Sequence, residues 1–453
     1  MTGTRHLHFA EALLPEGWAG NVRITVRDGL CAAIETEVAP APQDERHGLA
    51  IPGLPNLHSH AFQRGMAGLA ERRGPSSDSF WTWREIMYRF VDRIGPAELQ
   101  AIAALAYVEM LETGFTRVGE FHYLHHDLDG RPYDDPAEMA AALAAAAHET
   151  GIGLTLLPVF YAHAGFGGDE PGAGQRRFIC DIDRFALLLQ SSGRALADLP
   201  DAVLGAAPHS LRAVTPEELA TLQQIAPAGP FHIHIAEQER EVADCLAWSG
   251  ARPVAWLLDH AAVDGRWCLV HATHMQESET LRLAQTGAVA GLCPITEANL
   301  GDGLFNAPAY LAAGGRFGIG SDSNVLIDAS EELRLLEYGQ RLGHRGRNIF
   351  PQAAGASAGH ALFDGAVRGG AQALGVPGGL RVGEALDVVS LRPDHPSLAG
   401  KFRDAVLDSW IFAAGRTALD GVWRRGQKVV VNGRHVAREG VEMRYRRALQ
   451  SLL

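Results

Sequence analysis

The chain has 453 residues and a formal net charge of −13, which argues against a nucleic-acid partner because such a partner requires a basic surface. Hydrophobic residues make up 47% of the chain, enough for a substantial core, and the length exceeds that of one ordinary barrel. No stretch is apolar for long enough to span a bilayer, and the N-terminus lacks the apolar core of a signal peptide. We therefore expect a cytoplasmic protein without a membrane partner. Its five cysteines are odd in number and widely spaced, which favours reduced core thiols over disulfides.

Both ends of the chain contain segments with the sequence pattern of β-strands. In residues 22–26 apolar and polar side chains alternate ahead of a turn, and residues 387–391 and 422–434 also have the composition of strands. Neither flank could form a domain alone, so we predict one small β-sandwich domain assembled from both. The predicted division is residues 1–50 with 381–453 for this domain and residues 51–380 for a catalytic domain inserted between them.

Short apolar runs recur through the middle of the chain, with amphipathic or alanine-rich stretches between most of them. The candidate strands are residues 50–54, 115–121, 153–160, 202–208, 231–235, 268–272, 288–294 and 316–322. Eight alternations predict an α/β fold, a (β/α)8 barrel of the TIM type. One intervening helix has clear boundaries, with Asp135 as N-cap, Pro136 at the first helical position, an alanine-rich body to His148 and Gly151 as the stop.

Polar residues of the types that bind metals or transfer protons stand at the ends of several predicted strands. They are His58 and His60 after the first, His209 after the fourth, His234 in the fifth, His271 in the sixth and Asp322 in the eighth. One residue separates His58 from His60, so an extended backbone turns both imidazoles to the same side. Such a pair alone could arise by chance among 20 histidines. Because catalytic groups of these barrels stand at the C-terminal ends of strands, the whole set indicates a metal-dependent hydrolase.

Lysine limits the number of metal ions. The chain has two lysines, Lys401 and Lys428, and both lie beyond the predicted barrel. No lysine can therefore bridge two metals as a carbamate or form a Schiff base there, and we expect one divalent metal ion per chain. Histidine and aspartate ligands around a single ion suit zinc with a water in the remaining position, although iron or manganese would tolerate the same set.

Three side chains could move protons. Zinc lowers the pKa of a bound water to near neutrality, and Asp322, beside metal and water, could accept that proton while remaining a ligand. Glu237, three residues past His234, could carry a proton to a leaving nitrogen, or could instead orient a ligand histidine. His271 could polarise the attacked centre or stabilise the hydroxide, or could itself be a metal ligand.

Longer runs of the sequence carry a family resemblance. The pattern HSH after the first predicted strand, HIAE after the fifth, VHATH after the sixth and SDSN after the eighth resembles the amidohydrolase superfamily in its mononuclear deaminase branch. The runs PNLHSHAFQRGMAGLAE, FWTWREIMY, GEFHYLHHD, APHSLRAV, FHIHIAEQ and CPITEANLGDG are similar to the formimidoylglutamate deiminases, which hydrolyse N-formimino-L-glutamate to N-formyl-L-glutamate and ammonia in histidine degradation. The match covers nearly the whole chain, and runs of this length are far more specific than a short HxH motif.

The resemblance implies roles for individual residues. It implies that zinc is bound by His58, His60, His234 and Asp322, and that protons are moved by Glu237, His271 and Asp322. It implies that the substrate is contacted by Gln63, Arg84, Tyr123, His209 and Arg212. A homodimer is implied by the same resemblance.

The residues themselves support two of these substrate contacts. Formiminoglutamate carries two carboxylates, and a protein with a net charge of −13 can hold them only with local positive groups. Guanidinium forks match carboxylates in bidentate fashion, so Arg84 and Arg212 are candidate clamps for a small dicarboxylate. Arg212 follows the fourth predicted strand, whereas Arg84 lies in an aromatic segment that could fold over the mouth as a lid. The alternative for Arg84 is an amphipathic helix with a solvated arginine.

Three functional hypotheses remain. The first is hydrolysis of the formimino group, and the second is a related deaminase acting on a purine or pyrimidine ring, whose pocket would be lined by aromatic or amide groups. The third is a barrel protein that binds or assembles without catalysis, against which the intact polar groups at the strand ends argue. After the seventh predicted strand, Glu297, Asn299 and Asp302 could shape the pocket or make a turn.

Overall fold

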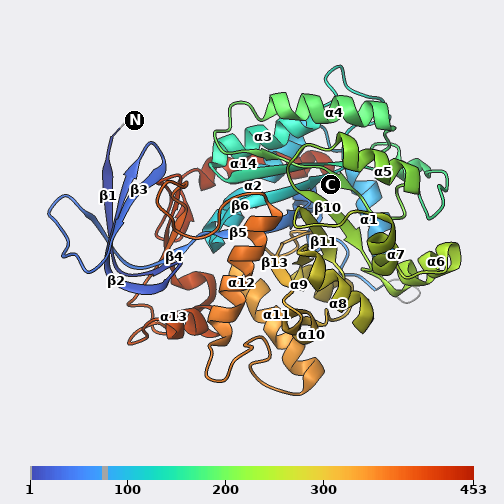
Figure 1. The fold of residues 1–453 in the computed structure, drawn as a ribbon. Helices are drawn as coiled ribbons and strands as arrows, with labels where there is room; N and C mark the ends of the chain where they lie inside the picture. The colour runs from blue at the N-terminus through green and yellow to red at the C-terminus, as the bar shows by residue number, and fades with distance from the viewer. Residues whose placement is uncertain (1–2, 74–79) are drawn as a thin grey trace.

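The computed structural model describes residues 3–73 and 80–453 (Figure 1). Residues 1 and 2 of the predicted small domain lie outside the described residues. A barrel of parallel strands surrounded by helices occupies most of the molecule, and a β-sheet built from both ends of the chain lies at one side, at the left of Figure 1. The predicted fold class is confirmed.

Among the described residues, the barrel consists of eight parallel strands, the fourth of which is in two pieces. In order around the barrel they are β5 (Leu54–Ser59), β6 (Phe115–His122), β7 (Gly153–Phe160), β8 (Val203–Leu204) with β9 (Ala207–Pro208), β10 (Phe231–Ile235), β11 (Trp267–His271), β12 (Val289–Leu292) and β13 (Arg316–Ile319). Isolated bridges close the two seams: Ala206 with Phe231 and Ser210 with His234 at one, and Ser59 with Asp322 at the other. A predicted metal ligand, His234 or Asp322, therefore takes part directly in the closure of each seam.

The first barrel strand differs from the prediction. Residues 50–52, expected to open the barrel, end β4 (Glu45–Pro52), which pairs with β14 (Val388–Leu391) in the other sheet. The barrel strand is β5, which begins one residue after Gly53 and carries His58. The apolar run continues across this junction, so the hydrophobic pattern could not show where one sheet ends and the other begins.

The fourth predicted strand is interrupted at Gly205. The short strands β8 and β9 both pair with β7, one on each side of this glycine. A Cβ at residue 205 would lie 2.5 Å from the carbonyl oxygen of Pro230, so the backbone of the next strand approaches too closely for any other residue. The second piece directs the chain toward His209, whose backbone N–H donates to the Phe160 carbonyl.

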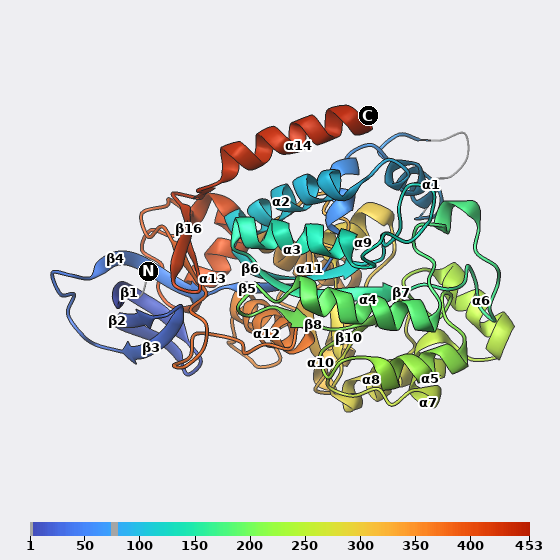
Figure 2. The ribbon, with the colours of Figure 1, turned by 90° about the horizontal axis from the view of Figure 1, so that it is seen from above.

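Helices cover the outside of the barrel (Figures 1 and 2). They are α2 (Pro96–Thr113), α3 (Glu138–Thr150), α4 (Ile182–Ala195), α5 (Pro216–Ile225), α6 (Glu239–Ser249), α7 (Pro253–His260), α8 (Glu277–Thr286), α9 (Pro294–Leu300), α10 (Ala307–Ala312), α11 (Ala329–His344) and α12 (Ala358–Ala373). Within residues 3–73 and 80–453, no helix combines the length and apolar character needed to cross a membrane.

Helix α3 begins later than predicted. Asp135 was expected as its N-cap, but the helix starts at Glu138, because Asp135 shapes a preceding turn. Its carboxylate accepts hydrogen bonds from Ser191 Oγ and the Ala137 N–H, and its carbonyl accepts from the Glu138 N–H. The predicted stop at Gly151 is confirmed, with a left-handed φ of 78°.

Both ends of the chain contribute to one sheet. Its strand order is β17-β16-β15-β14-β4-β1-β2-β3, with β1 (Arg5–Leu14), β2 (Gly17–Arg27), β3 (Leu30–Glu35), β15 (Leu419–Arg424), β16 (Gln427–Val431) and β17 (Arg434–His435). Between β14 and β15 the chain forms the short helix α13 (Asp404–Ser409). After β17, the C-terminal helix α14 (Arg438–Leu452) lies along α2 (Figure 2). The division at residues 50 and 381 stays a prediction.

The five cysteines are buried and unpaired, which agrees with the expectation of core thiols. Burial raises the pKa of Cys31 and of Cys245 to about 11, and that of Cys180 to about 12. These thiols therefore stay protonated near neutral pH and are poor nucleophiles or metal ligands.

Gly369 lets α12 lie directly against β13, the strand that leads to Asp322. A Cβ at this position would stand 1.8 Å from the carbonyl oxygen of Phe317. We expect Gly369→Ala to push the helix off the strand and to reduce the free energy of unfolding by about 1–3 kcal/mol, as overpacking does. The measurement is the thermal midpoint of unfolding.

Gly440 provides the matched control. It lies at an exposed position of α14, where the nearest atom to an added Cβ is Arg444 Nη1 at 3.8 Å. Gly440→Ala should leave the midpoint unchanged or raise it, because alanine favours a helix by up to about 1 kcal/mol over glycine. Equal midpoints for the two variants would show that the close approach at residue 369 is not a constraint.

Candidate functional site

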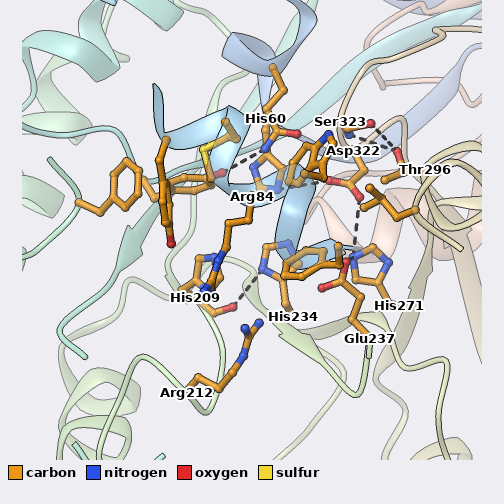
Figure 3. A pocket seen from close by; sticks show the side chains of 18 of the residues that line it. His60, Arg84, His209, Arg212, His234, Glu237, His271, Thr296, Asp322 and Ser323 are labelled. Carbon is orange, nitrogen blue, oxygen red and sulfur yellow. Dashed lines mark hydrogen bonds and ion pairs between the residues drawn. The ribbon is translucent and has the colours of Figure 1, made fainter. Parts of the chain in front are cut away.

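One pocket at the C-terminal mouth of the barrel brings the predicted site residues together (Figure 3). With its opening, it has a volume of about 570 Å³. The predicted residues that line it are His60, Gln63, Arg84, Tyr123, His209, Arg212, His234, Glu237, His271 and Asp322. In Figure 3, Arg84 and Arg212 lie near His209 on one side, and Glu237 lies beside His271 on the other. His58, the remaining predicted residue, is fully buried.

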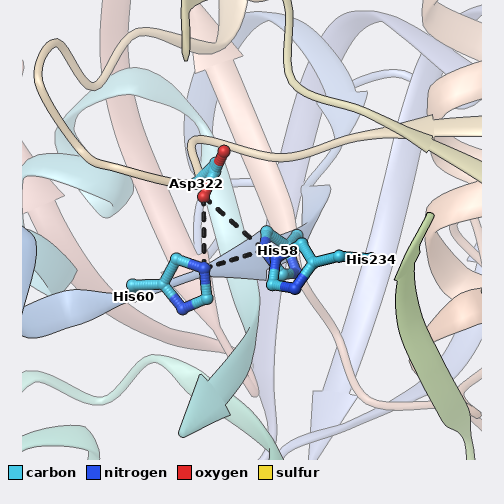
Figure 4. Close-up of side chains that lie close together, drawn as sticks. All are labelled: His58, His60, His234 and Asp322. Carbon is cyan, nitrogen blue, oxygen red and sulfur yellow. Dashed lines mark hydrogen bonds and ion pairs between the residues drawn. The ribbon is translucent and has the colours of Figure 1, made fainter. Parts of the chain in front are cut away.

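Three imidazole nitrogens and one carboxylate oxygen converge beneath this pocket (Figure 4). His58 Nε2 lies 3.2 Å from His60 Nε2 and 3.0 Å from His234 Nε2. Asp322 Oδ1 lies 3.3 Å from His60 Nε2 and 3.6 Å from His58 Nε2. The predicted ligand set is therefore brought together by the fold.

These spacings fit one metal ion. Ligand bonds of about 2.0–2.1 Å arranged tetrahedrally put neighbouring ligand nitrogens about 3.3 Å apart. The outer nitrogens of two rings are already engaged, since Nδ1 of His60 donates to the Phe121 carbonyl at 2.9 Å and Nδ1 of His234 donates to the His209 carbonyl at 3.1 Å. Each ring therefore presents the lone pair of Nε2 to the cluster.

The protonation of the cluster also suits a cation. Burial lowers the pKa of His58 to about 3, and burial lowers the pKa of His60 and of His234 as well. Although burial alone would raise it, the pKa of Asp322 lies below its usual value because His58 and His60 stand beside it. Neutral imidazoles and an ionised carboxylate are the forms that bind metals.

A buried polar network fixes the ligands at the seam of the barrel. The Asp322 N–H donates to the His58 carbonyl, and the His60 N–H donates to the Asp322 carbonyl, both at 2.9 Å. Asn324 Nδ2 then donates to Ser59 Oγ and to the carbonyls of His60 and Asp322, each at 3.1 Å. The two segments that carry three of the ligands are therefore bonded to each other through their backbones.

The backbone is strained at the ends of the strands that carry the site. Residues other than glycine with positive φ include Ala236 (51°), His271 (68°), Ala272 (48°), Asp322 (43°) and Asn324 (54°). Such conformations are unfavourable for these residues and persist only where the surrounding contacts impose them. At Ala236, the next turn is held by the buried Glu241, whose carboxylate accepts from the N–H groups of Ala236 and Glu237.

His271 stands between carboxylates. Its Nε2 lies 3.8 Å from Glu237 Oε1 and 3.7 Å from Asp322 Oδ2, the oxygen that does not face His60. Burial opposes its protonation, but Glu237, Glu297 and Asp322 outweigh burial and raise its pKa to about 10. Burial also raises the pKa of Glu237 to about 7. A cation and an acid close to neutrality therefore lie next to the cluster.

The roles of Glu297 and Asp302 could not be assigned from the sequence, and the structure places them in and just after α9, the helix that follows β12. Glu297 Oε1 accepts a hydrogen bond from His271 Nδ1 at 3.2 Å, which orients that ring. Asp302 lies beside Glu237 and His271 and accepts from Gln238 Nε2, and burial raises its pKa to about 9. Asn299 turns outward and donates to Glu71. The signal was present in the run 293–303, but its spacing does not show which carboxylate faces inward.

The other side of the pocket carries groups with unused hydrogen-bonding capacity. Gln63 Nε2 donates to Tyr123 Oη at 3.0 Å, which leaves Gln63 Oε1 buried without a partner among the described residues. Nε of Arg84 and Nε of Arg212 are also buried without a hydrogen-bond partner among the described residues. Burial lowers the pKa of His209 well below its usual value, and Arg212 lowers it further, so this ring is neutral. Unused donors and acceptors of this kind can bind a polar ligand.

Arg84 lies on α1 (Phe80–Val91), which packs through Met87, Phe90 and Val91. Its guanidinium lies over the Trp81 ring at 4.5 Å and over the Tyr88 ring at 5.6 Å. It therefore faces the pocket from the amphipathic helix, half-buried and with its Nε shielded from solvent. Thr296 and Ser323, which sequence reasoning did not select, also line the pocket and bond each other at 2.9 Å.

Family comparison agrees with this geometry. A family model described as "Amidohydrolase family" matches residues 49–436. The chain belongs to the amidohydrolase family. A second family model, "Formimidoylglutamate deiminase HutF, N-terminal domain", matches residues 4–48. The resemblance inferred from the motifs is confirmed, and the barrel is that of a metal-dependent hydrolase that acts on carbon–nitrogen bonds.

Individual relatives of this amidohydrolase extend the comparison. It is 52% identical over 452 residues to the formimidoylglutamate deiminase of Pseudomonas aeruginosa, covering 98% of this chain and 99% of the relative. The crystal structure of an amidohydrolase from Brucella melitensis superposes with a TM-score of 0.96 at 58% identity, covering 99% of each chain. An adenosine deaminase from Xanthomonas campestris with bound zinc shares the fold at a TM-score of 0.82 and 23% identity, covering 99% of this chain and 98% of that one.

Proposed function

We propose that this amidohydrolase hydrolyses N-formimino-L-glutamate to N-formyl-L-glutamate and ammonia in histidine degradation. One observation carries the proposal: the same pocket combines a metal-type cluster, an acid–base pair and two guanidiniums, Arg84 and Arg212, that have no carboxylate partner among the described residues. A small substrate with an amidine at one end and two carboxylates matches these three parts. The formimidoylglutamate deiminase at 52% identity supports the same substrate.

A single zinc ion would be held by His58, His60, His234 and Asp322, whose converging atoms and protonation states fit it. When bound, the ion would supply a water molecule acidified to near neutrality and would polarise the attacked group. Lys428 pairs with Glu45 in the terminal sheet, so it is not a bridging group for a second ion in the barrel.

The protein's own groups would move the protons. Asp322 turns one oxygen toward the ligand cluster and the other toward His271, so it can take a proton from the attacking water. Protonated His271 then stabilises the negative charge that develops on the attacking oxygen. Glu237, with a pKa near 7, delivers a proton to the departing nitrogen. Water contributes its oxygen to the formyl group, and the nitrogen leaves as ammonia.

The arginine side of the pocket would fix the substrate. Arg84 and Arg212 pair with its carboxylates through bidentate hydrogen bonds. Tyr123 and neutral His209 lie beside the cluster, with ring centres 5.1 Å from His60 and 4.9 Å from His234 respectively. With Gln63, which lines the same pocket, they would offer hydrogen bonds that orient the amidine toward the attacking water.

Arg212→Ala should chiefly weaken binding of the dicarboxylate. Truncation leaves a substrate carboxylate desolvated without its partner, which typically costs about 2–5 kcal/mol, so we expect KM to rise by about 30-fold or more with a smaller change in kcat. The measurement is the dependence of the initial rate on substrate concentration. The control is Arg282→Gln, which changes an exposed arginine that pairs with Asp259 on the outside of the barrel. An unchanged KM would remove Arg212 from the clamp.

Product analysis tests the reaction. Turnover of N-formimino-L-glutamate in ¹⁸O-water should give one ammonia per substrate and N-formyl-L-glutamate with one ¹⁸O in the formyl group. Release of formamide with unlabelled glutamate, which is cleavage of the other carbon–nitrogen bond, would contradict the proposed chemistry.

A further inference from the structure

Trp81 stands where three segments of the pocket mouth meet. The Cζ atoms of Arg84, Arg240 and Arg212 lie 4.5, 4.6 and 5.6 Å from the centre of its ring. Arg84 is on α1 with Trp81 itself, whereas Arg212 follows β9 and Arg240 lies in the first turn of α6, after the strand that carries His234. One indole therefore links α1 to the loop that follows β9 and to the first turn of α6.

Three positive groups lie close together on this ring. Although burial opposes the charge of Arg212, Glu241 and Glu237 raise its pKa without forming a direct ion pair with it. No carboxylate of the described residues forms an ion pair with Arg84 or Arg212, and Arg240 pairs only with the largely exposed Asp244, at 3.6 Å. The face of an indole attracts a guanidinium through its quadrupole but does not occupy the in-plane N–H donors. The arrangement keeps the guanidiniums grouped and leaves their hydrogen bonds for an anion.

We propose that Trp81 is the positioning residue of the dicarboxylate clamp and determines its specificity. Its ring holds Arg84 and Arg212 at the spacing that recognises a dianion, and it places Arg240 at the rim as a third positive charge. The identity of the dianion rests on the proposed function. The preference for two carboxylates over one does not require turnover, so it can be measured separately.

Calorimetric binding of two product analogues to the metal-loaded protein tests this role. N-formyl-L-glutamate carries both carboxylates, and N-formyl-L-glutamine carries an amide in place of the distal one. Native protein should bind the first more tightly. Trp81→Leu should reduce that preference by about tenfold, the scale of one to two lost cation–π contacts, and Trp81→Phe should retain most of it because the aromatic face remains.

Two controls separate positioning from general damage. Trp18→Leu removes a half-buried indole of the terminal sheet, far from the pocket, whose Nε1 donates to Asp404. It should leave the preference for the dianion unchanged. Arg240→Gln should weaken dianion binding by about two- to threefold at low salt and have no effect at high salt, because a rim charge is screened.

The outcomes distinguish this inference from the proposed function. Equal weakening of both ligands by Trp81→Leu, or an unchanged preference, would overturn the role of Trp81. A native protein that binds the dianion preferentially but does not release ammonia from formiminoglutamate would refute the proposed reaction and leave the clamp standing. A native protein that turns over the substrate without preferring the dianion would overturn the clamp alone.

Discussion

Glu237→Gln should abolish ammonia release while leaving the metal bound. The carboxylate lies 3.8 Å from His271 Nε2 and is not among the four converging ligand atoms, so its loss should not open the metal site. An amide of the same shape cannot deliver a proton to the departing nitrogen. Loss of a general acid of this kind typically lowers kcat by about 10²- to 10⁴-fold. Initial rates and the metal content of the same preparation provide the measurement.

The control for this variant is Glu239→Gln, the same change two residues along the chain, at an exposed position in the first turn of α6. It should retain full activity. Even a modest general acid accelerates a reaction by more than about tenfold. If Glu237→Gln kept more than about a tenth of the native kcat, the proposal that Glu237 delivers the proton would be wrong. If it lost the metal, Glu237 would be part of the ligand set.

Removal of the metal should lower activity to the uncatalysed background, and one equivalent of zinc per chain should restore it. The cluster offers three imidazoles and one carboxylate, which with a water completes the coordination of a single ion. Metal analysis of the apoprotein titrated with zinc, with activity followed in parallel, gives the stoichiometry. Two tightly bound ions, or turnover that survives full metal removal, would contradict the mononuclear site.

Two histidines on one strand allow a matched comparison. His234→Asn should lose the metal and the activity, because this ring contributes one of the converging nitrogens. His232→Asn changes a histidine two residues earlier on β10 whose Nε2 donates to the Ala373 carbonyl instead. It should keep its zinc and most of its activity. Similar metal loss in both variants would indicate general unfolding of the strand.

The ends of the barrel strands could be predicted from the sequence. The metal cluster could therefore be predicted as well, because its residues lie at those ends. A parallel barrel places the C-terminal ends of all its strands at one mouth, so His58, His234 and Asp322 had to lie close together once the eight apolar runs were recognised. The positions of β6, β7 and β10 could be read directly, and the predicted runs 115–121, 153–160 and 231–235 agree with the observed strands to within one residue. The junction of β4 with β5 could not, since both strands are buried and the run does not change character at Gly53.

What the sequence did not show depends on contacts between distant segments. Glu297 orients His271 because α9 begins directly after β12 and turns this side chain inward, whereas Asn299, two residues on in the same helix, turns outward and bonds Glu71. Asp135 has the residue type of an N-cap, yet Ser191 from a different helix draws its carboxylate into a turn. The grouping of Arg84, Arg212 and Arg240 on Trp81 likewise joins three segments that are far apart in the chain.

Ammonia release from a panel of N-formimino-L-glutamate, guanine, cytosine and adenosine is the most direct test of the proposed function. The two guanidiniums of the pocket, which form no ion pair with a carboxylate in the described part of the chain, favour a dicarboxylate over a neutral ring. Formiminoglutamate alone should release ammonia, with kcat/KM in the usual enzymatic range of about 10⁴–10⁸ M⁻¹s⁻¹. Ammonia from a ring substrate together with none from formiminoglutamate would contradict the assignment and make the chain a nucleobase or nucleoside deaminase.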